Sequence, residues 1–259
     1  YSEAHPGAIE GAGTGKLLVE NGVVIKNNVS PIAGAVYVGR DGSFSMQGGE
    51  LGNNIGGMPR HGFVNTSGSK LDGYDKSYWG QAAYYYGAGA VYNLGSFTMS
   101  GGSISGNRGE YGAVCNVGSG SIDLQSGSIT DNHAVTLNGT DTDYDLSISG
   151  YTEVNTPVDV FGAGAGSGGG LFISGSTKDN VIGSGMTISG NTAVENGGGV
   201  ALASCSDLTR IIAGYETVAG GYENNGSPAL VPIYRSSTMF GSKVNVNLLP
   251  GAVISGNTA

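Results

Sequence analysis

The feature that most constrains the fold is a repeat in which an aliphatic residue is followed three positions later by Asn. The pairs are Ile25/Asn28, Leu51/Asn54, Ile104/Asn107, Ile129/Asn132, Ile188/Asn191 and Ile254/Asn257. Two spacings give the undisturbed period, because Asn28 and Asn54 are 26 residues apart and Asn107 and Asn132 are 25 apart. A period of this length is typical of a solenoid, in which each repeat packs on its neighbours.

Each repeat has the pattern of short strands. Apolar and small polar residues alternate in Phe97-Thr98-Met99 and in Ser103-Ile104-Ser105, which is the period of a strand with one buried face. An earlier segment places an aliphatic residue after two small ones, at Val36, Val91, Val114, Leu171 and Val200. The sequence therefore predicts coils of about three parallel strands, with Ile104, Ile129, Ile188 and Ile254 in one interior stack.

The recurring Asn is expected to form a ladder at one corner of the coils. Stacked coils bring Asn107 over Asn132, where the amide of one can bond to the next coil. Asn also tolerates a left-handed backbone better than most residues, so we expect that conformation at these positions. Replacing Asn132 by Ala should cost about 1 kcal/mol, as the loss of a partly buried side-chain hydrogen bond usually does.

The pattern of Gly197-Gly-Gly-Val200 and Met99-Ser-Gly-Gly-Ser-Ile-Ser-Gly-Asn107 resembles the pectin-lyase-like, right-handed parallel β-helix repeats of large bacterial cell-surface and adhesin-like proteins. The resemblance covers most of residues 15 to 259 and implies an all-β, single-stranded right-handed β-helix. Relatives range from adhesive stalks to polysaccharide lyases, so the resemblance specifies a fold rather than an activity. No catalytic motif of a lyase or hydrolase family can be matched residue by residue.

Longer gaps between the repeats predict insertions. The remaining Asn spacings are 53, 59 and 66 residues, so we expect one domain over residues 1–259 with insertions near 58–87, 136–165 and 206–242. Ser147 to Tyr151 copies the repeat tail and predicts a degenerate coil, whereas Ser206 to Tyr215 has helical apolar spacing after a capping Ser. The chain reads as a piece of a longer protein, whose further coils or domains cover its edge.

Composition and net charge limit the classes of binding partner that we expect. The chain has 50 Gly, only 12% charged residues and a net charge of −9. Such a chain is repelled by nucleic acid and by anionic membranes. It has no run of 18 apolar residues, so no membrane insertion is expected. The repeat family and this composition favour an extracellular or cell-surface location.

The first insertion concentrates aromatic residues. Its candidates for a ligand-binding surface are Tyr74, Tyr78, Trp79, Tyr84, Tyr85 and Tyr86. Aromatic faces beside polar groups suit sugar rings, and functional residues favour loops on a rigid scaffold. The alternative is that these rings only pack the insertion onto the coils.

The second insertion places three carboxylates at alternate positions, Asp141, Asp143 and Asp145. Three oxygen ligands on one edge could hold Ca²⁺, which is the one cofactor that the chain suggests. The Gly and distal Glu of an EF-hand are absent, and a solvated acidic loop is the simpler interpretation.

Other reactive residues give weaker signals. Cys115 follows the buried Val114, in the place of Tyr37, Tyr92 and Phe172, whereas Cys205 lies out of register; unpaired thiols are favoured over a disulfide. The three His residues are scattered. Arg108 and Glu110 are interpreted as exposed corner charges or as the flanks of a groove.

Three function classes follow. The favoured one is a non-enzymatic structural and adhesive module that contacts glycan or a host surface protein through the aromatic insertion. The alternative is a carbohydrate-active enzyme, a polysaccharide lyase or glycoside hydrolase, that uses a groove of the β-helix. The third is binding to ice or a crystal surface through a hydroxyl array, namely Ser103/Ser105, Ser128/Thr130, Ser147/Ser149 and Thr187/Ser189.

Overall fold

The computed structural model describes residues 8–11, 14–30, 32–56, 62–65, 87–135, 151–154, 166–174, 178–203, 210–218, 229–236 and 244–259. Within these ranges every helix or strand is a β-strand. No helix in the described part is long and apolar enough to cross a membrane.

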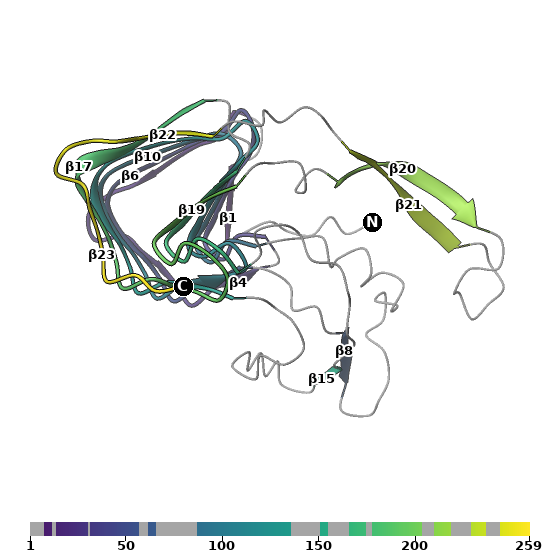
Figure 1. Ribbon diagram of the computed structural model, residues 1–259. Coiled ribbons are helices and arrows are strands. Elements are labelled where there is room, and N and C mark those ends of the chain that lie inside the picture. Colours follow the sequence, from purple (N-terminus) through teal and green to yellow (C-terminus); the bar gives the residue numbers. More distant parts are fainter. Residues whose placement is uncertain are drawn as a thin grey trace.

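Three parallel sheets form the body of the molecule (Figure 1). Sheet A contains β1 (Ile9–Gly11), β5 (Val36–Val38), β9 (Val91–Asn93), β12 (Val114–Val117), β16 (Leu171–Ser174) and β19 (Val200–Ala203). Sheet B contains β2 (Lys16–Val19), β3 (Val24–Lys26), β6 (Ser43–Gly52), β10 (Ser96–Ser105), β13 (Ser121–Thr130), β17 (Asp179–Ser189), β22 (Asn245–Leu248) and β23 (Val253–Ser255). Sheet C contains β4 (Val29–Ser30), β7 (Ile55–Gly56), β11 (Arg108–Gly109), β14 (His133–Ala134) and β18 (Thr192–Ala193).

The chain visits the sheets in the order A, B, C and then begins again. We call each such pass a rung: rung 1 is β1–β4, rung 2 is β5–β7, rung 3 is β9–β11, rung 4 is β12–β14, rung 5 is β16–β18, and rung 6 contains β19, β22 and β23. Figure 1 looks along the stack, and the three sheets enclose a three-sided interior. This all-β arrangement of stacked parallel sheets is compatible with a β-helix-like fold.

Two antiparallel pairs lie outside the three sheets. One joins β8 (Gly62–Asn65) to β15 (Tyr151–Val154), and the other joins β20 (Arg210–Val218) to β21 (Ala229–Ser236). Each pair contradicts a prediction from the sequence, namely a degenerate coil at Tyr151 and a short helix from Ser206 to Tyr215. Tyr151 belongs to this pair and closes no coil, and residues 210–215 are strand rather than helix, because cross-strand pairing overrides the local apolar spacing.

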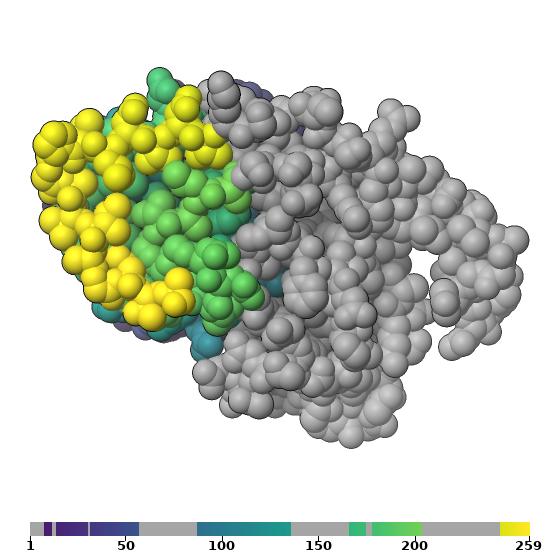
Figure 2. All heavy atoms as spheres, in the orientation of Figure 1, coloured from purple at the N-terminus to yellow at the C-terminus, as the bar shows by residue number. Residues whose placement is uncertain are grey.

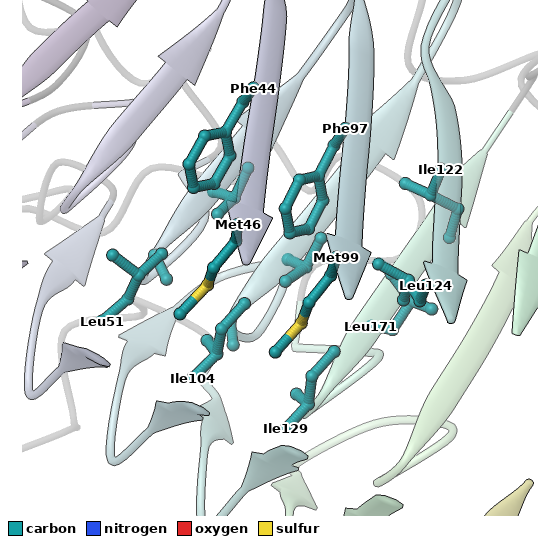
Figure 3. Packing of buried hydrophobic residues seen from close by; sticks show 14 of the residues in the cluster. Phe44, Met46, Leu51, Phe97, Met99, Ile104, Ile122, Leu124, Ile129 and Leu171 are labelled. Carbon is teal, nitrogen blue, oxygen red and sulfur yellow. The ribbon is translucent and has the colours of Figure 1, made fainter. Parts of the chain in front are cut away.

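The interior is filled by columns of apolar side chains, one residue from each rung (Figure 3). Phe44 and Phe97 stack with their ring centroids 4.9 Å apart. The predicted isoleucine stack is confirmed for Ile104, Ile129 and Ile188, which are completely buried and in register. Ile254 pairs with Ile188 in the same column but is 42% exposed, because it lies in the last rung.

The predicted Asn ladder is confirmed over all six rungs. In each step one Asn donates its backbone N–H and its Nδ2 to the Oδ1 of the Asn in the next rung. The ladder runs through Asn28, Asn54, Asn107, Asn132, Asn191 and Asn257, with Nδ2–Oδ1 distances of 2.9 or 3.0 Å. Nδ2 also donates to a carbonyl of the previous rung, as Asn132 does to Ile104. Each corner is thus cross-linked in both directions.

The left-handed backbone expected at the ladder Asn lies one residue earlier. Positive φ values occur at Asn27, Asn53 and Asp131 and, in the other three rungs, at Gly106, Gly190 and Gly256. The residue before the ladder Asn thus has the left-handed conformation at the corner between sheet B and sheet C, and the ladder Asn hydrogen-bonds along the stack.

A second amide ladder was not predicted from the sequence. Asn93 donates Nδ2 to Asn116 Oδ1 at 2.6 Å, and Asn116 donates to Asn180 Oδ1 at 3.0 Å. All three side chains are completely buried. This ladder links the ends of sheet A strands to the start of β17, so two corners of the described stack are held by amide bonds.

The outer face of sheet A carries a second apolar cluster. Cys115 lies in register with Tyr92 and Phe172, as the sequence pattern predicts, and Tyr37 pairs with Tyr92. Tyr111 stacks on Phe172 with a centroid distance of 4.4 Å. Cys115 is fully buried in this cluster; Cys205 lies outside the described residues.

Candidate functional site

The residues proposed from sequence as ligand and metal sites lie outside the described residues. These are Tyr74, Tyr78, Trp79, Tyr84, Tyr85 and Tyr86 of the first insertion, and Asp141, Asp143 and Asp145 of the second. Their roles stay predictions. The described part nevertheless shows how the two insertions connect to the scaffold.

The first two insertions leave the scaffold at equivalent points and pair with each other. One follows β7 and the other follows β14, so both connect sheet C to sheet A. Within them, β8 and β15 pair antiparallel, with Asn65 opposite Tyr151 and Gly62 opposite Val154. Because the pairing is antiparallel, the chain that continues toward Tyr74 and the chain that arrives from Asp145 meet the pair at the same end.

Both insertions also return to one corner of the scaffold. The backbone N–H of Tyr111 donates to the carbonyl of Gly87, and the N–H of Gly166 donates to the carbonyl of Glu110. Gly87 and Gly166 are the residues at which the described chain resumes after each insertion. Glu110 and Tyr111, between β11 and β12, therefore hold the re-entry points of both.

The burial of Glu110 differs from one of its sequence interpretations. One of the two interpretations makes it an exposed corner charge, which is wrong because it is only 2% exposed. A carboxylate is rarely buried without polar partners, and the backbone carbonyl of Glu110 accepts a hydrogen bond from Gly166. The corner that receives the insertions is thus a polar, closely packed position.

A polar column crosses the outer face of sheet C beside this corner. It consists of Arg108, His133 and Thr192, which are paired in register from rung 3 to rung 5; Ile55 of rung 2 precedes Arg108 in the same register. His133 Nδ1 lies 2.7 Å from Thr192 Oγ1, which is hydrogen-bonding distance. Arg108 precedes His133 by one rung, so a cation, an imidazole and a hydroxyl follow one another along the stack.

Burial and charge favour the neutral form of His133. Its pKa is lowered from the ordinary value of 6.5, mainly because burial penalises the charged ring and also because Arg108 is nearby. The carboxylate of Asp131 acts in the opposite direction and more weakly. A neutral imidazole bonded through Nδ1 can accept or donate one proton through Nε2. Within the described residues no group of three or more His, Cys, Asp or Glu could hold a metal ion.

The sequence held a signal for this column that our interpretation missed. Arg108, His133 and Thr192 each directly follow a ladder Asn, at positions 107, 132 and 191. Aligning the repeats on the ladder would have placed these three in one outward column. His133 was read instead as one of three scattered histidines.

The hydroxyl array stands in two columns on the outer face of sheet B. Ser103, Ser128 and Thr187 form one column, and Ser105, Thr130 and Ser189 form the other. The register is as the sequence repeat predicts, whereas Ser147 and Ser149 lie outside the described residues. The face offers small hydroxyls at the spacing of the rungs, about 4.8 Å.

Comparisons of the chain with protein-family models, with curated proteins and with solved structures found no match.

Proposed function

We propose that the chain is a single-stranded, right-handed parallel β-helix that serves as a rigid, non-enzymatic module of a bacterial cell-surface protein. Its task is to display a contact surface for glycan or a host surface protein, carried by the first two insertions. Right-handedness follows from the strong bias of parallel crossover connections. In the longer protein, further coils or domains continue the stack.

Rigidity supports this function. Both amide ladders and the interior columns run from rung to rung, so bending the stack would break buried hydrogen bonds and packing together. A stiff rod is a sound means of holding a contact site away from a surface, since each rung adds about 4.8 Å of height.

The pairing of β8 with β15 is the observation that carries the proposal. Two insertions that are far apart in sequence are joined to each other and return to one corner of the rod. The aromatic segment and the acidic segment leave this pair at the same end. In the proposed site the aromatic side chains stack on sugar rings, and Asp141, Asp143 and Asp145 bind Ca²⁺ beside them.

A glycan array of the whole chain, with polysaccharide-degradation assays run in parallel, tests the proposal. We expect binding that is lost in Trp79→Ala while the melting temperature is unchanged. Tyr222→Ala, which removes an aromatic ring from the third insertion, is the matched control and should bind normally. Turnover of any polymer would overturn the non-enzymatic function.

Calcium is tested separately. Titration calorimetry with millimolar Ca²⁺ should give heat in the wild type and none in Asp143→Asn. No heat in the wild type would remove the metal and leave the aromatic contact surface standing.

The polar column on sheet C supports the alternative, a carbohydrate-active enzyme. Arg108 could stabilise developing negative charge, and neutral His133 could act as a proton acceptor. If degradation assays give product, His133→Ala should abolish it, and Thr192→Val should reduce it by changing the orientation of the ring. Product that is unaffected by His133→Ala would place the chemistry elsewhere.

A further inference from the structure

Two tyrosines on the outer face of sheet A reach solvent. Tyr37 on β5 and Tyr92 on β9 are partly exposed. The other aromatic residues whose side chains the structure describes are buried, namely Phe44, Phe97, Tyr111 and Phe172. Rungs 2 and 3, which carry the two tyrosines, each have a described rung on both sides. The exposure of the two rings therefore belongs to the internal stack and does not depend on either end of it.

The two rings form a continuous surface, which we call the Tyr37–Tyr92 surface. Tyr37 pairs in register with Tyr92, and the ring centroids lie 5.9 Å apart with an angle of 14° between the ring planes. Leu94 is partly buried against the same cluster. Cys115 and Phe172 continue the column in rungs 4 and 5 but are completely buried. The apolar column on sheet A is thus closed at rungs 4 and 5 and partly open at rungs 2 and 3.

The open part of the column adjoins the insertions. After the first insertion the described chain resumes at Gly87, and Tyr92 lies five residues later. Both antiparallel pairs, β8–β15 and β20–β21, lie on the sheet A side of the stack in Figure 1. On the opposite side of the same view sheet B forms the surface, as residues 244–259 show in yellow (Figure 2). Sheet A is therefore the side of the rod that is turned toward the insertions.

Two opposite charges flank the tyrosines. Glu10 lies opposite Tyr37 in register. The pKa of Tyr37 is raised from 10.0, mainly by burial and also by Glu10, while Arg40 acts in the opposite direction. The phenol therefore keeps its proton at neutral pH and can both donate and accept a hydrogen bond. A charged ligand would be repelled by one of the two flanking groups, whereas a neutral polyhydroxylated ring would be repelled by neither.

We propose that Tyr37 and Tyr92 form a binding subsite for a neutral sugar unit, with Glu10 and Arg40 as polar groups at its rim. The sugar packs its C–H groups against the two rings and exchanges hydrogen bonds with the Tyr37 hydroxyl and the rim. Ligand sites are typically aromatic or apolar with a few polar groups that fix orientation. The subsite rests on the proposed glycan function and extends the contact surface from the insertions onto sheet A. A glycan that reaches both contacts gains affinity from their linkage.

Tyrosine ring signals in NMR spectra of the whole chain test the subsite. The signals of the two rings are assigned with Tyr37→Phe and Tyr92→Phe, and the neutral glycans of the array are titrated into the wild type and into Trp79→Ala. Both signals should shift in the wild type, and in Trp79→Ala they should still shift at glycan concentrations above those that an array detects. Tyr37→Ala should weaken glycan binding about threefold to tenfold, as the loss of one aromatic contact does. Thr98→Ala, on the outer face of sheet B, is the control and should bind normally.

The outcomes separate the subsite from the insertion site. Binding that Trp79→Ala removes and Tyr37→Ala leaves unchanged would overturn the subsite and leave the insertion site standing. Binding that Tyr37→Ala weakens and Trp79→Ala does not would support the subsite and place the main contact outside the aromatic insertion. A wild type that binds only charged glycans, or only a protein, would exclude the neutral-sugar subsite while the display function stands.

A second variant keeps the subsite testable if Tyr37→Ala impairs folding. Arg40→Gln retains both rings and changes only one exposed polar group. It should weaken binding of the same glycans and leave the melting temperature unchanged. Normal binding by Arg40→Gln together with Tyr37→Phe would show that the polar groups at the rim do not contact the sugar, and the proposed subsite would be wrong.

Discussion

Truncation of Asn132 to Ala should be among the most destabilising changes that remove only a polar side chain. Four hydrogen bonds end on this side chain: two donated by Asn107 to its Oδ1, and two donated by its Nδ2 to Ile104 and Asn191. After truncation, the backbone N–H of Asn107 and the carbonyl of Ile104 lose these partners in a fully buried position. A buried polar group left without a partner costs about 1–3 kcal/mol. We therefore expect a loss of roughly 3 kcal/mol, larger than the loss expected for a partly buried amide.

Urea denaturation followed by two spectroscopic probes measures this loss, provided that the probes coincide, since long repeat arrays can unfold in stages. Asn28→Ala is the matched control, because Asn28 lies in the first rung, is only partly buried and donates its amide to Asn54 alone among the described contacts. Its loss should cost under about 1 kcal/mol. Equal losses at positions 132 and 28, or a loss below about 0.5 kcal/mol at 132, would refute the view that the ladder stabilises through burial.

Three further predictions follow from the described residues. Because the pKa of His133 is lowered from 6.5 on folding, its contribution to stability is full above that pH and falls as pH drops below it; His133→Gln should flatten this slope in melting temperatures recorded from pH 5 to 8. Gly34→Ala should prevent close stacking, because its Cβ would lie 2.0 Å from the carbonyl oxygen of Gly89, whereas Gly22→Ala, with open space but positive φ, should cost only about 1–2 kcal/mol. Phe97→Ala should cost about 3–5 kcal/mol, since it removes a completely buried ring from the interior column between Phe44 and Ile122.

Each of these has a result that would contradict it. A slope in His133→Gln equal to that of the wild type would assign the pH dependence to other groups. Gly34→Ala as stable as Gly22→Ala would mean that the rungs can separate without cost. Retention of the wild-type melting temperature in Phe97→Ala would show that the neighbouring residues collapse into the space.

The sequence predicts the scaffold well because the same residue types meet themselves in every rung. Once Ile104 is placed over Ile129, the period alone puts Asn107 over Asn132 and the serines of sheet B over one another. The left-handed residue was placed one position too late, because the repeat shows which two residues share the corner but not which of them has a positive φ. The Asn93–Asn116–Asn180 ladder has no such period, since Asn180 lies on β17 rather than on a sheet A strand, and only the three-dimensional stack brings it beside Asn116.

Positions outside the repeat were harder to predict because local pattern there competes with distant pairing. Tyr151 copies a repeat tail and Ile211 and Ile212 have helical spacing, yet each joins an antiparallel pair with a segment that no local signal identifies. The burial of Glu110 likewise depends on a corner where two insertions return, so a charged residue that a single repeat would expose becomes enclosed. His133 is intermediate, since its place is fixed by the ladder but its lowered pKa depends on burial and on Arg108 in the preceding rung.

The position of the insertions follows from the way the scaffold is held together. Most strand residues enter an interior column or pair with the neighbouring rung, and the strands of sheet B accommodate only small register shifts, such as the one extra residue of β17 between Ile182 and Gly185. A long insertion within a strand would disrupt this pairing. The long segments lie in connections between sheets: after β7, after β14 and between β19 and β22. Two of them share the connection from sheet C to sheet A and pair through β8 and β15. A surface built at that corner can change its side chains without altering any interior column, and this separates the proposed contact function from the stability of the rod.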